Sequence, residues 1–110
     1  MSGKSITNSN IGTLCYSSPE VVRGEEYDYR ADVWSLGCII YEMCTGSILF
    51  NSTNEKSLVD KICNQRLPDL PEAYSCDLQM IYTLCLRRVK EERPSAKELL
   101  GSEGNISTFY

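Results

Sequence analysis

The sequence predicts a mainly α-helical protein with one hydrophobic core, and three observations lead to that prediction. The longest apolar run, residues 30–45, has the periodicity of a helix. Other apolar segments at helical spacing follow residues that favour helix starts. No stretch alternates apolar and polar residues as a half-buried strand would. The chain of 110 residues has room for one core only.

Residues 30–45 are predicted to form the central helix of the fold. At about 100° per residue, its four polar positions share an arc of roughly 140° and leave apolar residues around most of the circumference. These four are Asp32, Ser35, Glu42 and Thr45. We expect this helix to begin next to Asp28 or Tyr29, to stop at Gly46 and to be buried on nearly all sides. It is shorter than the ~20 apolar residues of a membrane span.

Shorter helices are predicted on both sides of it in the sequence. Ser18 and Pro19 suit the N-cap and first turn of a helix over residues 19–22. Apolar spacing predicts two more, over residues 54–64 and from Ser75 as N-cap to Leu86. Ser95 and Glu98 have the spacing of a capping box at the start of a last helix, which Gly101 should end.

Charge limits the classes of partner. The formal net charge is −4, and the eleven Lys and Arg residues are scattered. Such a chain lacks the basic patch that binds nucleic acid or an anionic membrane, so we expect neither partner. Because no signal peptide or membrane segment is present, we expect a cytoplasmic or nuclear protein.

The six cysteines are interpreted as reduced, buried, small apolar residues. Most lie within apolar stretches, and no secretory signal precedes them. The sequence contains no histidine and no Cys-x-x-Cys spacing, so it predicts no metal site.

Three ordered motifs resemble the C-terminal part of the large lobe of a eukaryotic Ser/Thr protein kinase. Gly-Thr-Leu-Cys-Tyr-Ser-Ser-Pro-Glu at 12–20 is similar to the end of an activation segment. Asp-Val-Trp-Ser-Leu-Gly at 32–37 is similar to the start of the central F helix, and Arg-Pro-Ser at 93–95 completes the set. Three motifs in this order are more specific than any one alone. The Ser-Pro-Glu at 18–20 and the run from Leu70 to Leu78 resemble the NIMA-related (NEK) type.

The resemblance implies a buried ion pair between Glu20 and Arg93, which would tie the activation segment to the last helices. A carboxylate and a guanidinium can form two parallel hydrogen bonds across such a distance in sequence. The alternative is that Glu20 only favours a helix dipole and that Arg93 is solvated. In the family, the residue matched by Asp32 anchors the catalytic loop by accepting backbone N–H bonds. Its alternative is again a first-turn acid.

Two further roles are implied in the activation segment. Thr13 would help to position the catalytic carboxylate and the substrate hydroxyl, and the alternative is an ordinary loop threonine. The residues that would form the pocket for the substrate residue after the phosphoacceptor are Leu14, Cys15, Tyr16 and Ser17. Ser9 lies where such kinases often carry an activating phosphate, although a solvated linker serine explains it equally well.

The machinery of phosphoryl transfer is missing from the sequence. There is no Gly-x-Gly-x-x-Gly, no His-Arg-Asp and no Asp-Phe-Gly, so no ATP, Mg²⁺ or other cofactor is expected on this chain. The fold class expected is therefore the C-terminal helical subdomain of the protein-kinase-like fold, without the N-lobe and catalytic loop. We expect a flexible activation-loop remnant over 1–11, a partial kinase domain over 12–100 and a disordered tail over 101–110.

Two functions remain open at this point. The chain is either the substrate-docking part of a Ser/Thr kinase that is inactive alone, or a non-catalytic interaction module derived from a kinase, that is, a truncated pseudokinase. Its partner would be a protein substrate or a regulatory protein in either case. We expect the chain to be a fragment, a truncated gene model or a degenerate duplicate.

Overall fold

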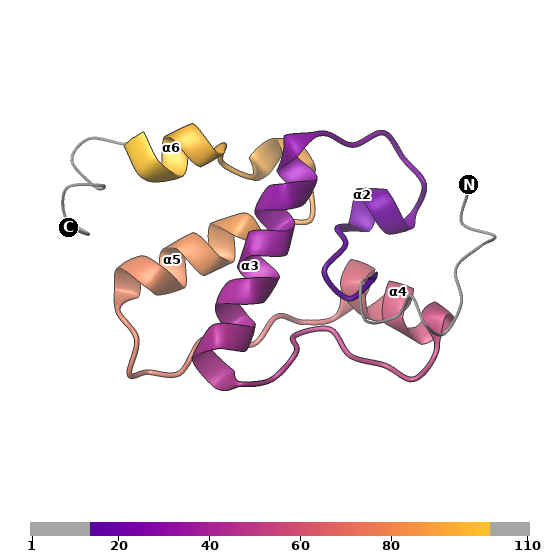
Figure 1. Cartoon of the computed structure of the whole chain (residues 1–110), viewed down its shortest axis with the longest axis horizontal. Helices are drawn as coiled ribbons and strands as arrows, with labels where there is room; N and C mark the ends of the chain where they lie inside the picture. The colour runs from indigo at the N-terminus through magenta and orange to yellow at the C-terminus, as the bar shows by residue number, and fades with distance from the viewer. Residues whose placement is uncertain (1–13, 102–110) are drawn as a thin grey trace.

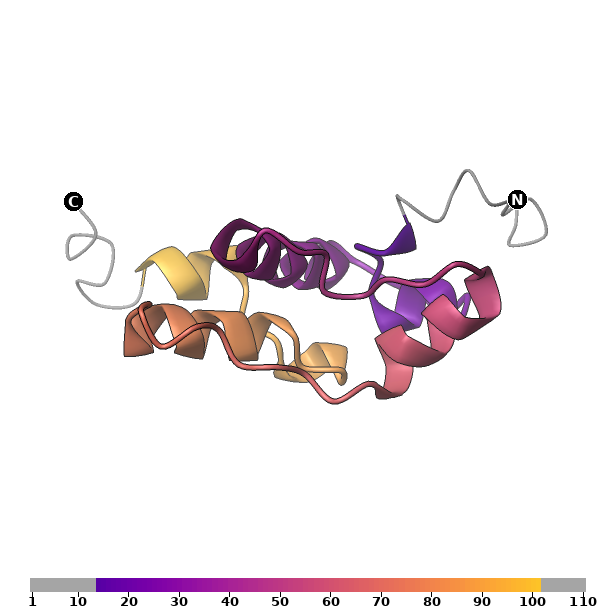
Figure 2. The ribbon, with the colours of Figure 1, turned by 90° about the horizontal axis from the view of Figure 1, so that it is seen from below.

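The computed structural model describes residues 14–101, which form helices and loops without a strand. The elements are α2 (Pro19–Val22), α3 (Tyr29–Thr45), α4 (Glu55–Asn64), α5 (Cys76–Cys85), the 3₁₀ helix η3 (Lys90–Glu92) and α6 (Ala96–Gly101). In Figure 1, α3 crosses the middle of the molecule, with α5 and α6 on one side and α2 and α4 on the other. Figure 2 shows α3 and α5 as two stacked layers. The predicted mainly α fold is confirmed.

The two ends of α3 are fixed by local signals, as predicted. Asp28 is the N-cap, and its Oδ1 accepts a hydrogen bond of 2.9 Å from the backbone N–H of Arg30. Gly46 follows the last turn with φ of +76°, and its N–H donates to the carbonyl of Glu42 at 2.7 Å. This left-handed backbone conformation is strained for most residues that carry a Cβ but not for glycine, so Gly46 suits the end of α3.

The starts of α4 and α5 follow the same logic. Asn54 Oδ1 accepts from the N–H of Ser57 at 2.8 Å, and Ser75 Oγ accepts from the N–H of Leu78 at 3.1 Å. Each bond satisfies an N–H that has no partner within its own helix. Both predicted helices are therefore confirmed to within one residue.

The capping box of α6 is also present. The N–H of Glu98 donates to Ser95 Oγ at 3.0 Å, and the N–H of Ser95 donates to Glu98 Oε1 at 2.7 Å. The end of this helix differs from the prediction, because Gly101 is its last helical residue and not the cap beyond it.

The core lies where α3 meets α5 and the loop that follows α3. The indole of Trp34 is fully buried and stacks on Phe50 with ring centroids 5.6 Å apart. On the other side, Gly37 lets α5 approach so closely that a Cβ there would lie 2.7 Å from Leu86 Cγ. The buried cluster includes Leu14, Cys15, Trp34, Cys38, Leu49, Phe50, Leu58, Ile62, Leu70, Tyr82 and Leu86.

The prediction that α3 is buried on nearly all sides is wrong for this chain. Leu36, Ile39 and Met43 are 41%, 42% and 78% exposed. These positions are three or four residues apart, so they form one apolar stripe along the helix. We call Leu36, Ile39 and Met43 the α3 stripe. Periodicity identified these positions as apolar, but the described part of the chain supplies no element that covers them.

The cysteines follow the prediction of burial only in part. Within residues 14–101, no disulfide joins any of the six. Cys15, Cys38 and Cys85 are buried, Cys44 and Cys63 are half-buried, and Cys76 at the start of α5 is exposed. Among the described residues, no helix has both the length and the apolar character that a bilayer crossing requires.

Candidate functional site

The segment of residues 14–18 is bound to one face of α3 by two side chains of that helix. Ser35 Oγ donates a hydrogen bond of 2.7 Å to the backbone carbonyl of Tyr16. The phenol of Tyr16 donates a hydrogen bond to Glu42 Oε1. This bond from a protonated phenol to a carboxylate raises the pKa of Tyr16 to about 12. Polar residues of α3 therefore fix both the backbone and the side chain of the segment.

Burial divides the residues expected to form the substrate pocket. Leu14 and Cys15 are buried and belong to the hydrophobic core, whereas Tyr16 and Ser17 are half-buried. Burial raises the pKa of the Cys15 thiol, and the nearby Glu42 carboxylate adds to the effect. Only Tyr16 and Ser17 of this set have surface to offer a ligand in the described structure. Leu14 and Cys15 instead pack into the core and so fix the segment from its buried side.

The helix α2 continues this segment and presents Glu20 to the interior. Ser18 occupies the N-cap position, but its hydroxyl makes no capping bond and is fully buried. Pro19 follows at the first helical position, where its missing N–H costs nothing. The turn ends at Gly24, whose φ of +75° suits glycine. The short helix therefore turns the chain tightly while directing the Glu20 carboxylate toward the C-terminal part of the fold.

Glu20 and Arg93 form a bidentate ion pair across 73 positions of sequence. Arg93 Nη1 and Nη2 donate to the two carboxylate oxygens of Glu20 at 2.7 Å each, and both residues are 3% exposed. Burial by itself would raise the pKa of the Glu20 carboxyl, but the hydrogen bonds and the positive charge of Arg93, together with a backbone hydrogen bond, outweigh burial and lower it. The carboxylate is therefore held in its charged form inside the protein.

The remaining donors of Arg93 bind backbone carbonyls. Its Nε donates to the carbonyl of Arg87 at 2.6 Å, Nη1 donates to that of Arg30 at 2.8 Å, and Nη2 donates to that of Arg88 at 3.3 Å. One guanidinium thus joins α2, the first turn of α3 and the loop after α5. A buried charge needs partners of this kind to offset the loss of hydration.

Asp32 lies in the first turn of α3 and is exposed. Its carboxylate makes no hydrogen bond or ion pair with any other residue in the 14–101 range. At helical spacing it continues the α3 stripe toward the N-terminus. The other two predicted positions, Ser9 and Thr13, lie outside the described residues.

Three contacts of this region were not anticipated from the sequence. The partners of Tyr16, which are Ser35 and Glu42, belonged to the predicted polar arc of α3, but no local pattern says what a helical polar residue will contact. The third is Arg88, whose guanidinium donates to the carbonyl of Ile62 at 2.8 Å and to that of Gln65 at 2.6 Å. Arg88 therefore satisfies acceptors at the C-terminal end of α4, where a positive charge also favours the helix dipole.

Metal binding finds no support in the described residues. Across positions 14–101, no three His, Cys, Asp or Glu side chains are grouped so that they could hold an ion. What this region offers is an anchored segment and an exposed stripe.

Comparison with known proteins identifies the family. Residues 1–103 match the model of the protein kinase domain. The chain is 43% identical over 90 residues to the Serine/threonine-protein kinase Nek4 of Mus musculus. The aligned residues make up 82% of this chain and 11% of that protein. It is 43% identical over 91 residues to the Probable serine/threonine-protein kinase nek2 of Dictyostelium discoideum, covering 83% of this chain and 22% of that protein.

A fungal relative extends the match. The G2-specific protein kinase nimA of Emericella nidulans is 34% identical over 102 residues, covering 93% of this chain and 15% of that protein. The chain thus spans less than a quarter of the length of each of these relatives. The predicted resemblance to NIMA-related kinases is confirmed, and the chain belongs to the protein kinase domain family, with relatives among the Nek and NimA Ser/Thr kinases.

Proposed function

We propose that this chain is the part of a Ser/Thr protein kinase that holds the protein substrate. In the complete domain, the γ-phosphate of ATP would be transferred to a serine or threonine hydroxyl of that substrate. The observation that carries this proposal is the buried pair of Glu20 and Arg93, because it ties the 14–18 segment to the helical platform. A substrate loop must be held in place to orient an incoming hydroxyl, and a bidentate buried pair does so.

Residues outside this chain would supply the chemistry. Phosphoryl transfer needs a glycine-rich cover and a lysine for the phosphates, a catalytic aspartate, and an aspartate and asparagine for Mg²⁺. The sequence has no Gly-x-Gly-x-x-Gly, no Asp-Phe-Gly and no histidine. ATP and Mg²⁺ would accordingly bind only to a complete domain, and this chain alone would not turn over.

The exposed face of α3 is where the rest of the domain would pack. The α3 stripe offers an apolar surface on the same helical face as Asp32, whose carboxylate is free of partners in the described part. As in the kinases that the chain resembles, the catalytic loop would lie against this aspartate, with its backbone N–H groups as donors. An apolar surface beside an unpaired acceptor suits such a loop and its adjoining helix, since both the burial and the hydrogen bonds would be satisfied together.

Complementation tests this proposal. The purified chain would be mixed with Mg²⁺, ATP and casein, with and without a separately expressed Nek-type segment that runs from the glycine-rich loop through Asp-Phe-Gly. Phosphate incorporation is expected only in the mixture. Arg93→Ala should abolish it, whereas Arg87→Ala should not, because the one ion pair of the Arg87 side chain within residues 14–101 is an exposed pair with Glu92. Transfer by the chain alone would contradict the proposal, and so would full activity of the Arg93→Ala mixture.

A non-catalytic interaction module is the second candidate, because the anchored 14–18 segment, with Tyr16 and Ser17 half-buried, can contact a protein without any chemistry. Such a module would bind a substrate or regulatory protein through the 14–18 segment and α4. The coding sequence before Met1 separates the two candidates. An open frame that encodes His-Arg-Asp and Asp-Phe-Gly supports the kinase, and an in-frame stop codon supports the module.

A further inference from the structure

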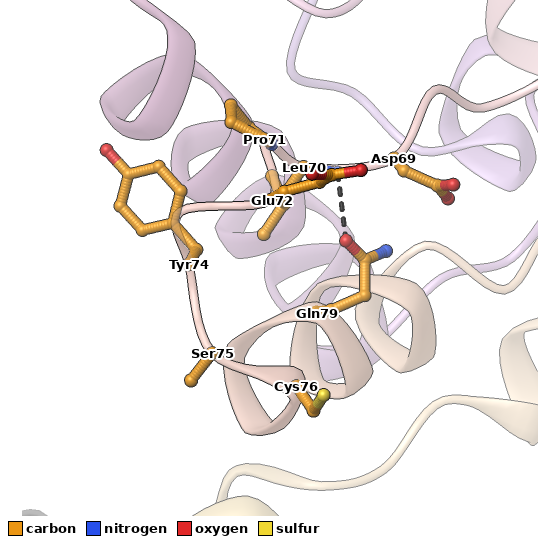
Figure 3. Close-up of a pocket in the computed structure, with 8 residues that line it drawn as sticks. All are labelled: Asp69, Leu70, Pro71, Glu72, Tyr74, Ser75, Cys76 and Gln79. Atoms are coloured by element: carbon orange, nitrogen blue, oxygen red, sulfur yellow. Dashed lines mark hydrogen bonds between the residues drawn. The ribbon is translucent and has the colours of Figure 1, made fainter.

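A groove lies between the loop of residues 69–75 and the first turns of α5. It has a volume of about 400 Å³, and the side chains that line it include Tyr74, Cys76 and Gln79 (Figure 3). Pockets that bind ligands usually have volumes of roughly 300 to 1,000 Å³. The groove lies at the end of α5 that points away from α2 (Figure 1), so it is separate from the 14–18 segment.

Hydrogen bonds from the loop to two helices hold the walls of this groove. The N–H of Leu70 donates to Gln79 Oε1 at 2.9 Å, which Figure 3 marks, and thereby joins the loop to α5. The phenol of Tyr74 donates to the carbonyl of Cys44 at 3.2 Å and joins the loop to the end of α3. A site whose walls are already in place loses little conformational entropy when a ligand binds.

The lining combines apolar surface with uncompensated negative charge. Pro71 and Tyr74 are exposed and present carbon atoms to the groove. Asp69 and Glu72 also line it, and Figure 3 shows both on the wall opposite Cys76. Residues 67–86 contain no lysine or arginine, and no ion pair found within residues 14–101 involves either carboxylate.

We propose that this groove binds a short segment of a partner protein in which a lysine or arginine adjoins a large apolar side chain. The cation would pair with Asp69 and Glu72, and the apolar side chain would pack on Pro71 and Tyr74. Two unpaired carboxylates at one rim attract a cation and repel phosphate, so the charge of the groove excludes nucleic acids and anionic lipids as occupants. This interaction goes beyond the proposed kinase function, because it uses neither the 14–18 segment nor the α3 stripe.

The test uses the whole 110-residue chain and a fluorescein-labelled peptide, Ser-Gly-Leu-Arg-Leu-Arg-Gly-Ser. Fluorescence anisotropy should give a Kd on the order of 100 μM or below, which weakens as salt screens the charges. Peptides with glutamate for arginine, or serine for leucine, should bind at least about tenfold more weakly, because each lacks one of the two required chemistries. Absence of binding, or equal binding of the three peptides, overturns the proposal.

Matched variants locate the binding site. Asp69→Lys with Glu72→Lys should weaken binding about tenfold or more, by replacing attraction with repulsion. The control is Glu26→Lys with Glu91→Lys, which makes the same change in net charge at exposed positions outside the groove. Equal weakening by the control would show unspecific attraction and overturn the proposal. Circular dichroism shows whether each variant is folded.

A second measurement on the unaltered chain keeps the proposal testable if the groove variant does not fold. The bound peptide should slow the alkylation of exposed Cys76 but not that of half-buried Cys63, as read by mass spectrometry. Equal rates with and without peptide contradict the proposal. Sedimentation tests whether a second copy of the chain occupies the groove instead. If the chain self-associates, and if Asp69→Lys with Glu72→Lys abolishes that self-association, the groove binds a second copy and the proposal is overturned.

Discussion

The guanidinium of Arg93 lies over the indole ring of Trp34, with its central carbon 5.2 Å from the ring centroid. The same guanidinium forms the bidentate pair with Glu20, so the buried ring of Trp34 in α3 packs directly against the ion pair. Arginine suits this position because its planar, weakly hydrated head can stack on a ring while its edge donates hydrogen bonds. The packing of the core and the position of the 14–18 segment are therefore linked through one side chain.

Arg93→Ala should destabilise the chain by about 3 to 5 kcal/mol, because it leaves the Glu20 carboxylate buried without its partner. Urea denaturation followed by circular dichroism measures the change. Arg93→Lys should recover only part of the loss, since an ammonium cannot make the two parallel bonds or stack on Trp34. The control is Arg23→Ala, which removes the exposed pair with Glu25 and a weak contact of 3.9 Å with Cys63 Sγ, and which should cost under about 1 kcal/mol. Equal effects at the two arginines would contradict the central place of Arg93.

Acid should weaken the fold through Glu20. Its pKa is lower in the folded chain than the value of about 4.3 typical of an unfolded one, so folding favours the charged form. The resulting stabilisation is fully present above the unfolded pKa and is lost as the pH falls through the lowered folded value. The free energy of unfolding, measured by urea titration from about pH 7 to pH 3, should fall in the acidic part of this range. Glu20→Gln should be less stable at neutral pH and should show a flatter acid dependence. An unchanged slope in that variant would exclude Glu20 as the cause.

The sequence predicted the helices well because their ends are decided locally. Asp28 and Gly46 bound α3 through bonds that reach no more than four residues, and the Ser95 and Glu98 capping box does the same for α6. Interactions between distant residues have no such signal. Glu20 and Arg93 were expected to pair only through the resemblance to kinases, since composition and spacing alone left both residues with solvent-exposed alternatives.

The limits of prediction are clearest on α3. Its periodicity identified apolar positions but could not tell which of them the same chain would cover, and so periodicity alone did not indicate the exposure of Met43. The polar positions posed the converse problem. Glu42 and Ser35 bind the segment at Tyr16, and nothing within three or four residues of either one indicates that contact.

Tyr16 should titrate well above a normal tyrosine. Its phenol donates to Glu42, and deprotonation would place two negative charges side by side, so its pKa is raised to about 12. NMR of ring-¹³C tyrosine, assigned with Tyr16→Phe, measures this value. Glu42→Gln should lower the pKa toward the usual value of about 10, because the neighbouring charge is removed. A Tyr16 pKa that does not change in Glu42→Gln would show that the two side chains do not interact in solution.

Gly37→Ala should destabilise the chain although alanine is the better helix former. In an exposed helix this substitution gains roughly 1 kcal/mol, but here the new Cβ would lie 2.7 Å from Leu86 Cγ and 3.0 Å from Cys85 Cβ. Overpacking of this kind costs about 1 to 3 kcal/mol, so the net change should be a loss. Urea denaturation measures it. The double variant Gly37→Ala with Leu86→Ala relieves the main clash and should lose less than the sum of the single variants. Strict additivity would mean that α3 and α5 are not in close contact at this point.

The α3 stripe should make the isolated chain adhesive. Leu36, Ile39 and Met43 expose contiguous apolar surface, and such surface binds hydrophobic dyes and promotes association. We expect the chain to enhance the fluorescence of anilinonaphthalene sulfonate and to melt over a broad temperature range. Replacing all three residues by glutamine, which has a similar helix propensity to leucine, should reduce dye binding while the helical circular dichroism is retained.

Met80→Gln, at an exposed position of α5 outside the stripe, is the control and should change little. A monomeric wild-type chain that melts cooperatively and ignores the dye would mean that this face of α3 is covered in solution. The catalytic part of a kinase would then have no open surface on α3 against which to pack.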